Sequence, residues 1–270
     1  GVQVQGSYTW GKSMDTGSGA YLSDPFSNSI PNLFSFDKSV RRSVSDYNIA
    51  QNLTINYTWI VPTSKSLPSA AEWALGGWQL GGIISVRNGL PFSPILGGDP
   101  LGYRTDDFDF PDRSKASGCE TAVNAGNPIN YIKASCFSLP VSTSANVAQC
   151  QTFGFVPAKA GPPPVAAIPG IAGTCANLVG NAGRNSIIGP GLVNFDFSVF
   201  KNNYIRRISE AFNVQFRAEM FNVFNHPNFN SPTSNNAIFD QSGVAVSGAG
   251  RIDSTSTTAR EVQFGLKVIW

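Results

Sequence analysis

Hydrophobic and polar residues alternate most clearly at the end of the chain. Every second position there is apolar, and the apolar set consists of Val262, Phe264, Leu266, Val268 and Trp270. The positions between them hold mostly polar or small residues. Because successive side chains of a β-strand point to opposite faces, the pattern predicts a strand with one hydrophobic face.

Five other segments alternate in the same way. In the clearest of them, Ile55, Tyr57 and Trp59 alternate with asparagine and threonine before Pro62 ends the pattern. The six predicted strands lie at about residues 2–12, 47–61, 77–90, 193–199, 212–220 and 262–270. The chain is therefore expected to be all-β.

The connections between these strands alternate in length. Residues 13–38, about 91–191 and 226–258 form long connections, whereas residues 62–76 and 202–210 form short ones. Outer-membrane barrels have short periplasmic turns and long extracellular loops. The asymmetry predicts an antiparallel transmembrane β-barrel segment whose C-terminus lies on the periplasmic side.

The composition is compatible with a protein that crosses a membrane by strands rather than by helices. Hydrophobic residues make up 41% of the chain, and charged residues only 13%, about half the usual share. There is no apolar run of about 18 residues, but a transmembrane strand needs only about 9–11. The net charge of +2, with scattered basic residues, argues against a nucleic-acid partner.

Six strands are fewer than the roughly eight of the smallest outer-membrane barrels. The chain also opens on Gly1 inside an alternating pattern. We interpret residues 1–270 as a fragment that forms the C-terminal part of a larger barrel, with the missing strands upstream.

Alternation alone also fits a soluble β-protein whose aromatic residues fill a core. This alternative is a secreted or cell-surface β-rich adhesion or binding module whose apolar faces pack together. Against it, the tryptophans gather near predicted strand ends, as in the aromatic belts of membrane interfaces. They are Trp10, Trp59, Trp73, Trp78 and Trp270.

Four cysteines fall within the longest connection and lack the C-x-x-C spacing of a metal site. We expect disulfides, and hence an oxidising compartment. Four cysteines allow three connectivities. Short loops close at the lowest entropic cost, which favours Cys119–Cys136 and Cys150–Cys175 over the two alternatives.

Several segments carry a resemblance to a known family. They are GSYTWGKSMD (6–15), GWQLGG (77–82), NGLPF (88–92), GRNSIIGPG (183–191), FRAEMFNVFNHPNF (216–229), GRI (250–252) and REVQFGLK (260–267). In this order they are similar to landmarks of Oar-like TonB-dependent receptors. Gly265, Val268 and Trp270 also resemble the C-terminal signal that the barrel-assembly machinery reads.

The resemblance implies a barrel of roughly 22 strands, filled by an N-terminal plug and energised through TonB by segments upstream of residue 1. It implies transport of an unidentified substrate across the cell outer membrane, without catalysis and without a cofactor. Outer-membrane lipid and the barrel-assembly machinery would be partners. The long loops would capture the substrate.

Candidate chemistry is sparse. No hydrolase or nucleotide-binding motif is present and His226 is the only histidine, so no catalytic residues are expected. Asp106, Asp107, Asp109 and Asp112 form a weak calcium candidate that lacks the order of an EF-hand. A solvated loop is the alternative.

Four charged residues fall on the polar faces of predicted strands, where a large barrel has its lumen. They are Asp196, Arg217, Glu219 and Lys267. A tight turn centred between Arg206 and Arg207 predicts that Asp196 and Arg217 pair across two strands. This polar wall either contacts the plug or is simply hydrated.

Overall fold

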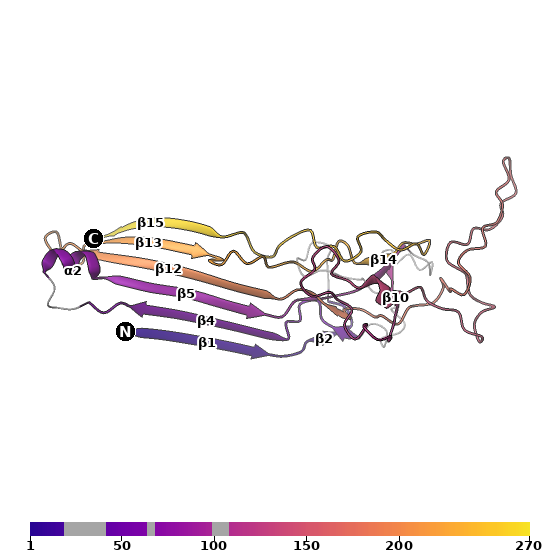
Figure 1. The fold of residues 1–270 in the computed structure, drawn as a ribbon, viewed down its shortest axis with the longest axis horizontal. Helices are drawn as coiled ribbons and strands as arrows, with labels where there is room; N and C mark the ends of the chain where they lie inside the picture. Colours follow the sequence, from indigo (N-terminus) through magenta and orange to yellow (C-terminus); the bar gives the residue numbers. More distant parts are fainter. Residues whose placement is uncertain (19–41, 64–67, 99–107) are drawn as a thin grey trace.

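The computed structural model describes residues 1–18, 42–63, 68–98 and 108–270. These residues form an elongated molecule (Figure 1). An antiparallel sheet occupies one end, and the long connections fold together at the other end. The predicted residues Asp106 and Asp107 lie outside the described part.

Six long strands form the sheet in the order β1-β4-β5-β12-β13-β15. Their bounds are β1 (Val2–Trp10), β4 (Gln51–Ile60), β5 (Trp78–Arg87), β12 (Leu192–Tyr204), β13 (Asn213–Phe221) and β15 (Glu261–Ile269). The predicted all-β, antiparallel class is confirmed, and each predicted strand corresponds to one of these. The sheet is open, since β1 and β15 each pair with one neighbour only.

Apolar side chains lie on one face of the sheet and polar side chains on the other, across all six strands. One row of direct partners runs Val2, Trp59, Leu80, Val199, Ala218 and Phe264. The adjacent row on the opposite face runs Gln3, Thr58, Gly81, Ser198, Glu219 and Gln263. The two-residue period of each strand is thus in phase with its neighbours, which produces an apolar face and a polar face.

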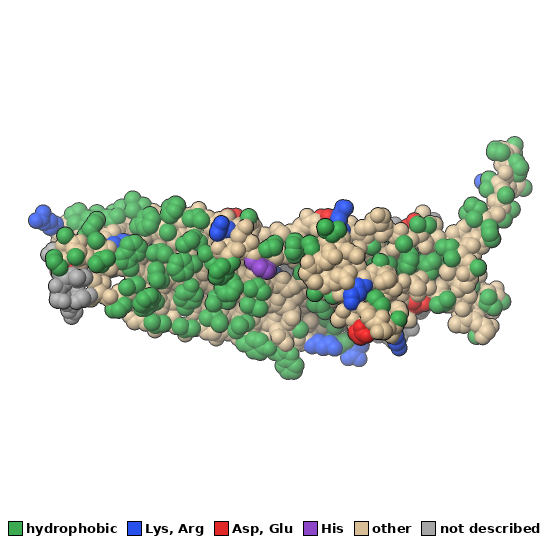
Figure 2. Space-filling view, viewed as in Figure 1, with side chains coloured by type: hydrophobic (Ala, Val, Ile, Leu, Met, Phe, Trp, Pro, Cys, Tyr) green, Lys and Arg blue, Asp and Glu red, His purple; other side chains and the backbone are tan. Residues whose placement is uncertain are grey.

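The apolar face is uncovered. Val2, Phe264 and Leu266 are 70%, 69% and 72% exposed, and Figure 2 shows hydrophobic side chains spread over the whole sheet. The soluble adhesion module requires that apolar faces pack together. Within the described residues no second sheet packs on this face.

One short connection contains a helix that the alternation did not predict. This helix, α2 (Ser69–Leu75), lies at the end of the sheet that also holds the C-terminus (Figure 1). In the described part of the chain, no helix is long and apolar enough to cross a membrane.

At the opposite end, the long connections build a folded region that we call the cap, comprising residues 11–18, 42–50, 88–98, 108–191 and 222–260. Its short elements are β2 (Met14–Asp15), β3 (Ser43–Val44), β6 (Pro91–Phe92), β7 (Ile95–Gly97), β8 (Phe108–Asp109), β9 (Asp112–Arg113), η1 (Ala134–Cys136), β10 (Phe137–Ser138), β11 (Ile187–Ile188) and β14 (Ala237–Phe239). Because β14 pairs with β7, two long connections are locked together.

The cap has its own hydrophobic core. Phe92, Phe110, Ile132, Ile187 and Ile238 are at most 2% exposed and belong to one cluster. The expectation of a long connection at about 91–191 therefore did not include this packed region. Its apolar residues are separated by glycine, proline and asparagine, so they show neither a period of two nor of 3.6.

Substitution of Gly82, on the apolar face, tests how tightly the side chains of the sheet are packed. Tyr57 lies directly opposite Gly82, and a β-carbon at residue 82 would approach the Tyr57 hydroxyl oxygen to 2.6 Å and also the backbone oxygen of Asp196. We expect Gly82→Ala to destabilise the folded protein by about 1–3 kcal/mol. Urea unfolding in lipid vesicles measures this.

Gly6→Ala is the matched control, because a β-carbon at Gly6, also on the apolar face, meets no atom within 4 Å. Equal unfolding midpoints for the two variants would contradict the packing argument.

Candidate functional site: the polar wall and the cap

The polar wall is the polar face of the six-stranded sheet, and it carries all four predicted charged residues. Glu219 lies between Ser198 and Gln263, and Lys267 lies opposite Gln215. Arg217 is flanked by Phe200 and by Gly265. Asp196 lies on the same face, opposite Ile83.

The predicted pairing of Asp196 with Arg217 is wrong. Arg217 lies opposite Phe200, and its guanidinium stacks over that ring at 4.7 Å from the centroid. The Asp196 carboxylate instead accepts hydrogen bonds from Asn194 Nδ2 and from the backbone N–H of Asn222, both at 2.9 Å.

The error arises from the end of β12, which extends further than the alternation indicated. The side-chain oxygen of Asn202 accepts hydrogen bonds from Asn213 Nδ2 at 3.0 Å and from Gln215 Nε2 at 2.8 Å. These bonds hold the Asn202 side chain within the paired strands, although the sequence placed residue 202 at the start of the short connection 202–210. Tyr204 pairs with Asn213, so the turn is centred between Ile208 and Ser209.

Within the described residues, none of the four wall charges forms an ion pair. The ion pairs there join Arg184 to Asp15 and Asp46, and Arg251 to Asp253. The wall therefore presents charged groups that are not neutralised by the chain around them.

The middle of the wall is hollowed. A depression of about 350 Å³ is lined chiefly by wall residues, including Asn56, Gly81, Ser198, Glu219 and Phe221. Gly81 has no side chain, which deepens the hollow. The arrangement combines a carboxylate, an amide and an aromatic edge, so it can accept hydrogen bonds and pack against an apolar group.

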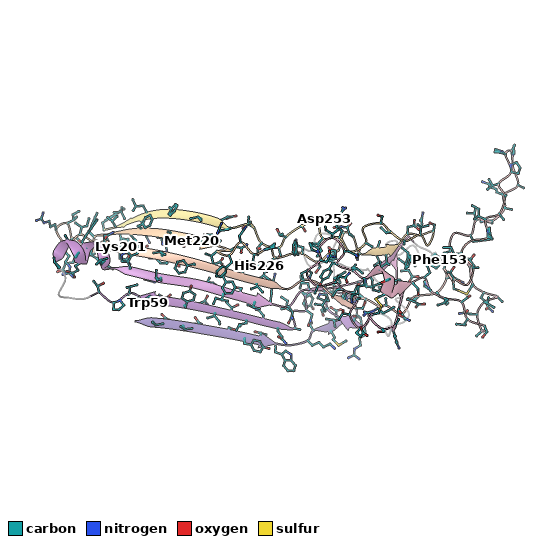
Figure 3. All side chains as sticks on the ribbon, viewed as in Figure 1. Trp59, Phe153, Lys201, Met220, His226 and Asp253 are labelled. Atoms are coloured by element: carbon teal, nitrogen blue, oxygen red, sulfur yellow. A yellow bond between two sulfur atoms is a disulfide. The ribbon has the colours of Figure 1, made fainter. Side chains whose placement is uncertain are left out.

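Asparagines join the wall to the cap. Asn222, which adopts a positive φ of 48°, donates hydrogen bonds from its side chain to the backbone oxygens of His226 and Thr258 at 3.0 and 3.1 Å. Asn228 accepts the N–H of Val193 at 2.8 Å. His226 lies exposed at this junction (Figure 3).

A buried cation holds three cap segments together. The Arg184 guanidinium pairs with Asp15, and with Asp46 at 3.2 Å, and the Arg184 and Asp46 side chains are 6% and 2% exposed. Asn185 Nδ2 donates to the backbone oxygen of Val44 at 2.7 Å and to Asp46 at 2.6 Å. One side-chain cluster thus joins residues 15, 44–46 and 184–185.

The two acids of this cluster respond differently to pH. Burial raises the pKa of Asp46 above its ordinary value, against the opposing contacts of Asn185 and Arg184. Burial acts in the same sense on Asp15, but hydrogen bonds from Ser18, Ser45 and Arg184 outweigh it and lower the pKa of Asp15. The contribution of Asp15 to stability is lost as the pH falls, whereas that of Asp46 is lost as the pH rises.

Both expected disulfides are present, Cys119–Cys136 and Cys150–Cys175. Cys136 is 1% exposed and belongs to the cap core. The second disulfide closes the base of a hairpin arm in which Val156 pairs with Ile168. The disulfides hold parts of the cap that contain little regular secondary structure.

A second hollow, of about 340 Å³, lies at the base of the cap and is mainly apolar. Pro128, Tyr131, Pro190, Phe229 and Ile252 line it. The Tyr131 hydroxyl donates to the backbone oxygen of Ile188 at 2.9 Å, and burial raises the pKa of Tyr131 to about 12. The phenol therefore stays neutral near pH 7, and the hollow suits an apolar or aromatic group.

The described members of the calcium candidate serve the cap fold. Asp109 accepts the N–H of Phe110 at 2.7 Å, and Asp112 accepts the N–H of Asn181 at 2.9 Å. Residues 1–18, 42–63, 68–98 and 108–270 contain no group of three or more acidic, histidine or cysteine side chains that could hold a metal ion. Calcium binding that involves Asp106 and Asp107 stays a prediction.

The three residues of the expected assembly signal lie on or beyond β15. Val268 pairs with Val214 on the apolar face, and Gly265 lies opposite Arg217 on the polar wall. Trp270 follows the strand and is 88% exposed.

Sequence reasoning missed the Arg184 cluster, although one signal pointed to it. Arg184 and Asn185 lie in the segment GRNSIIGPG, and Asn185 has a positive φ of 54°. Asparagine tolerates this conformation better than most residues. Arg184 was nevertheless unpredictable as a hub, because its two acids are more than 130 positions away in the chain.

Removal of the buried cation tests the cluster. Arg184→Met leaves Asp15 and Asp46 without their partner, and we expect a loss of about 3–5 kcal/mol in the stability of the cap. Hydrogen exchange over residues 11–18, 42–50 and 183–188 measures this loss. The sheet should keep its protection.

The control is Arg251→Ala, which breaks an ion pair whose side chains are 56% and 53% exposed. Exposed pairs contribute about 1 kcal/mol or less. Equal exchange in the two variants would show that Arg184 does not hold the segments together.

One comparison with known proteins gave a match. Residues 1–263 match the model of a family described as an outer membrane beta barrel domain. Neither a curated protein nor a solved structure matches the chain. The matched residues span all but the end of the sheet, and the open apolar face and one-sided long loops agree with such a barrel. The chain therefore belongs to the outer membrane beta barrel domain family and is a protein of the cell outer membrane.

Proposed function

We propose that this chain forms part of the wall of an Oar-like TonB-dependent receptor, which transports a substrate across the outer membrane without catalysing a reaction. The apolar face contacts outer-membrane lipid. Its large exposed side chains, such as Phe264 and Leu266, then bury their surface in hydrocarbon. The polar wall faces the lumen.

The observation that carries the proposal is the polar wall itself. Arg217, Glu219 and Lys267 have no ion-pair partner within the described residues, and a hollow opens beside Glu219. Charged groups of this kind fit a wide lumen that holds water, a plug or a substrate. In a narrow barrel they would have to be paired by side chains of the wall.

Pairing requirements support a barrel larger than six strands. In hydrocarbon the free edges of β1 and β15 would leave backbone groups without partners, at a cost of several kcal/mol each. We propose that strands outside these six complete the barrel. A plug and a TonB-interacting segment belong to the same proposal.

The landmarks shared with Oar-like receptors give independent support. Asn222 and Asn228 in the segment 216–229 join the wall to the cap, and Arg184 in the segment 183–191 joins cap segments. The resemblance thus rests on residues that hold the architecture. The cap, with its apolar hollow beside Tyr131, is the proposed region of substrate contact.

Energy coupling tests the transport proposal. Cells with and without the gene are given labelled metal chelates, cobalamin, oligosaccharides and oligopeptides, and accumulation is measured with and without TonB. We expect accumulation of one solute class that requires both the gene and TonB. Gene-dependent accumulation that persists without TonB would indicate a passive pore instead.

The terminal residue tests recognition by the barrel-assembly machinery. Trp270 is 88% exposed, so Trp270→Ala removes almost no contact within the protein. We expect a severalfold lower yield of assembled barrel, measured as heat-modifiable protein in outer-membrane fractions, with unchanged stability of the molecules that do assemble.

Trp10→Ala is the matched control, since Trp10 is 77% exposed and lies at the opposite end of the sheet. If both variants assembled like the unchanged protein, Trp270 would not be part of an assembly signal.

A further inference from the structure

A single charged residue lies on the apolar face of the six strands. Lys201 is directly opposite Trp78 on β5 and Phe216 on β13, both of which belong to that face. A lysine among lipid-facing side chains is costly unless its ammonium group reaches water or polar partners. Lys201 is nevertheless only 8% exposed.

Helix α2 supplies the polar partners. The Lys201 ammonium donates hydrogen bonds to the backbone oxygen of Trp73 at 2.7 Å and to that of Gly76, and lies 5.6 Å from the centre of the Trp78 ring. These carbonyls are at the C-terminal end of α2, where the helix dipole favours a cation. Figure 3 places Lys201 at this end of the sheet.

The link between α2 and the sheet is tight. Gly77, with a positive φ of 72°, accepts the N–H of Asn202 through its backbone oxygen at 2.9 Å. A β-carbon at residue 77 would collide with the backbone oxygen of Asn202. Trp78 Nε1 also donates to the backbone oxygen of Ala74 at 3.0 Å. The helix is therefore fixed to β5 and β12 and does not swing freely.

The exposed surface of α2 is mostly apolar, apart from the side that carries Glu72. At 3.6 residues per turn, Glu72 is opposite Ala70 and Ala74, and Trp73 and Leu75 lie on either side between them. Trp73 is 64% exposed and Leu75 is 59% exposed. Trp73 thus shares one side of the helix with Ala70 and Ala74, about 100° or more from Glu72, whereas Leu75 is only about 60° from Glu72.

We propose that α2 is a membrane-interface anchor, in which Trp73, with Ala70 and Ala74 beside it, enters the boundary between head groups and hydrocarbon of the periplasmic leaflet while Lys201 clamps the helix to the wall. This inference rests on the proposed contact of the apolar face with lipid. Amphipathic helices with tryptophan and leucine occupy this depth in membranes.

We assign lipid, rather than a periplasmic protein, as the partner of the exposed side of α2 because this helix is continuous with the apolar face. Lys201 and Trp78, which hold the helix, both belong to that face. Trp270, 88% exposed, lies at the same end of the sheet as α2 (Figure 1). Tryptophans at this level form the belt that marks a membrane interface.

Spin labels measure the depth of α2 directly. The four cysteines form two disulfides and no free cysteine is present among residues 1–270, so Ala74→Cys introduces the only thiol of this segment on the side of α2 opposite Glu72. The labelled full-length protein is reconstituted in vesicles of phosphatidylethanolamine and phosphatidylglycerol. Collision rates with oxygen, which prefers the bilayer, are compared with those of a water-soluble nickel chelate.

Labels at Glu72→Cys and Phe264→Cys are the aqueous and lipid references. We expect the oxygen-to-nickel ratio at residue 74 to be severalfold above that at residue 72 and to approach that at residue 264. A ratio at residue 74 equal to that at residue 72, with residue 264 in lipid, would overturn the anchor alone. An aqueous ratio at residue 264 would overturn the lipid contact of the apolar face.

The clamp has its own test. Lys201→Met removes the cation from the carbonyls of Trp73 and Gly76, and we expect a label at residue 74 to become more mobile and more accessible to the nickel chelate. Lys267→Met removes a cation from the polar wall and should leave that label unchanged. If Lys201→Met also left it unchanged, Lys201 would not be the clamp. If Lys201→Met failed to assemble, the depth measured with Lys201 intact would still decide whether α2 is an anchor.

Discussion

The structure depends on keeping the two faces of one sheet separate across six strands. Each strand alternates with a period of two, so a slip of one residue between any two neighbours would turn an apolar row onto the polar wall. The register avoids this throughout, from Val2 on β1 to Phe264 on β15. Lys201 is the one charged residue out of phase, and its ammonium is satisfied by the carbonyls of α2.

The two ends of the sheet differ in the connections that they carry. At the α2 end the connections are short, and a helix covers a charge on the apolar face. At the other end the long connections form a cap with its own core, two disulfides and a buried cation at Arg184. A region with few regular hydrogen bonds needs such cross-links, because loop closure alone costs conformational entropy.

The wall and the cap are physically continuous, which matters for the transport that we propose. Asp196 lies on the polar wall and accepts the N–H of Asn222, whose side chain holds the backbone of His226 and Thr258 in the cap. A group that binds in the hollow beside Glu219 would therefore act close to a joint of the cap. Membership of an outer-membrane barrel family is the setting of this arrangement, and in the barrel that we propose, lipid lies on one face of the sheet and a lumen on the other.

The sequence by itself determined the class of fold, the six strands, the side to which each strand residue belongs and the two disulfide pairs. These features follow from local alternation and short loops, which one chain displays directly. Only the tertiary structure decided the register of β12 against β13, the core of the cap, the Arg184 cluster and the contact of α2 with Lys201. Each of these joins residues whose sequence spacing carries no period. Asn202, for example, continues a strand because Asn213 and Gln215 on the next strand donate hydrogen bonds to its side-chain oxygen.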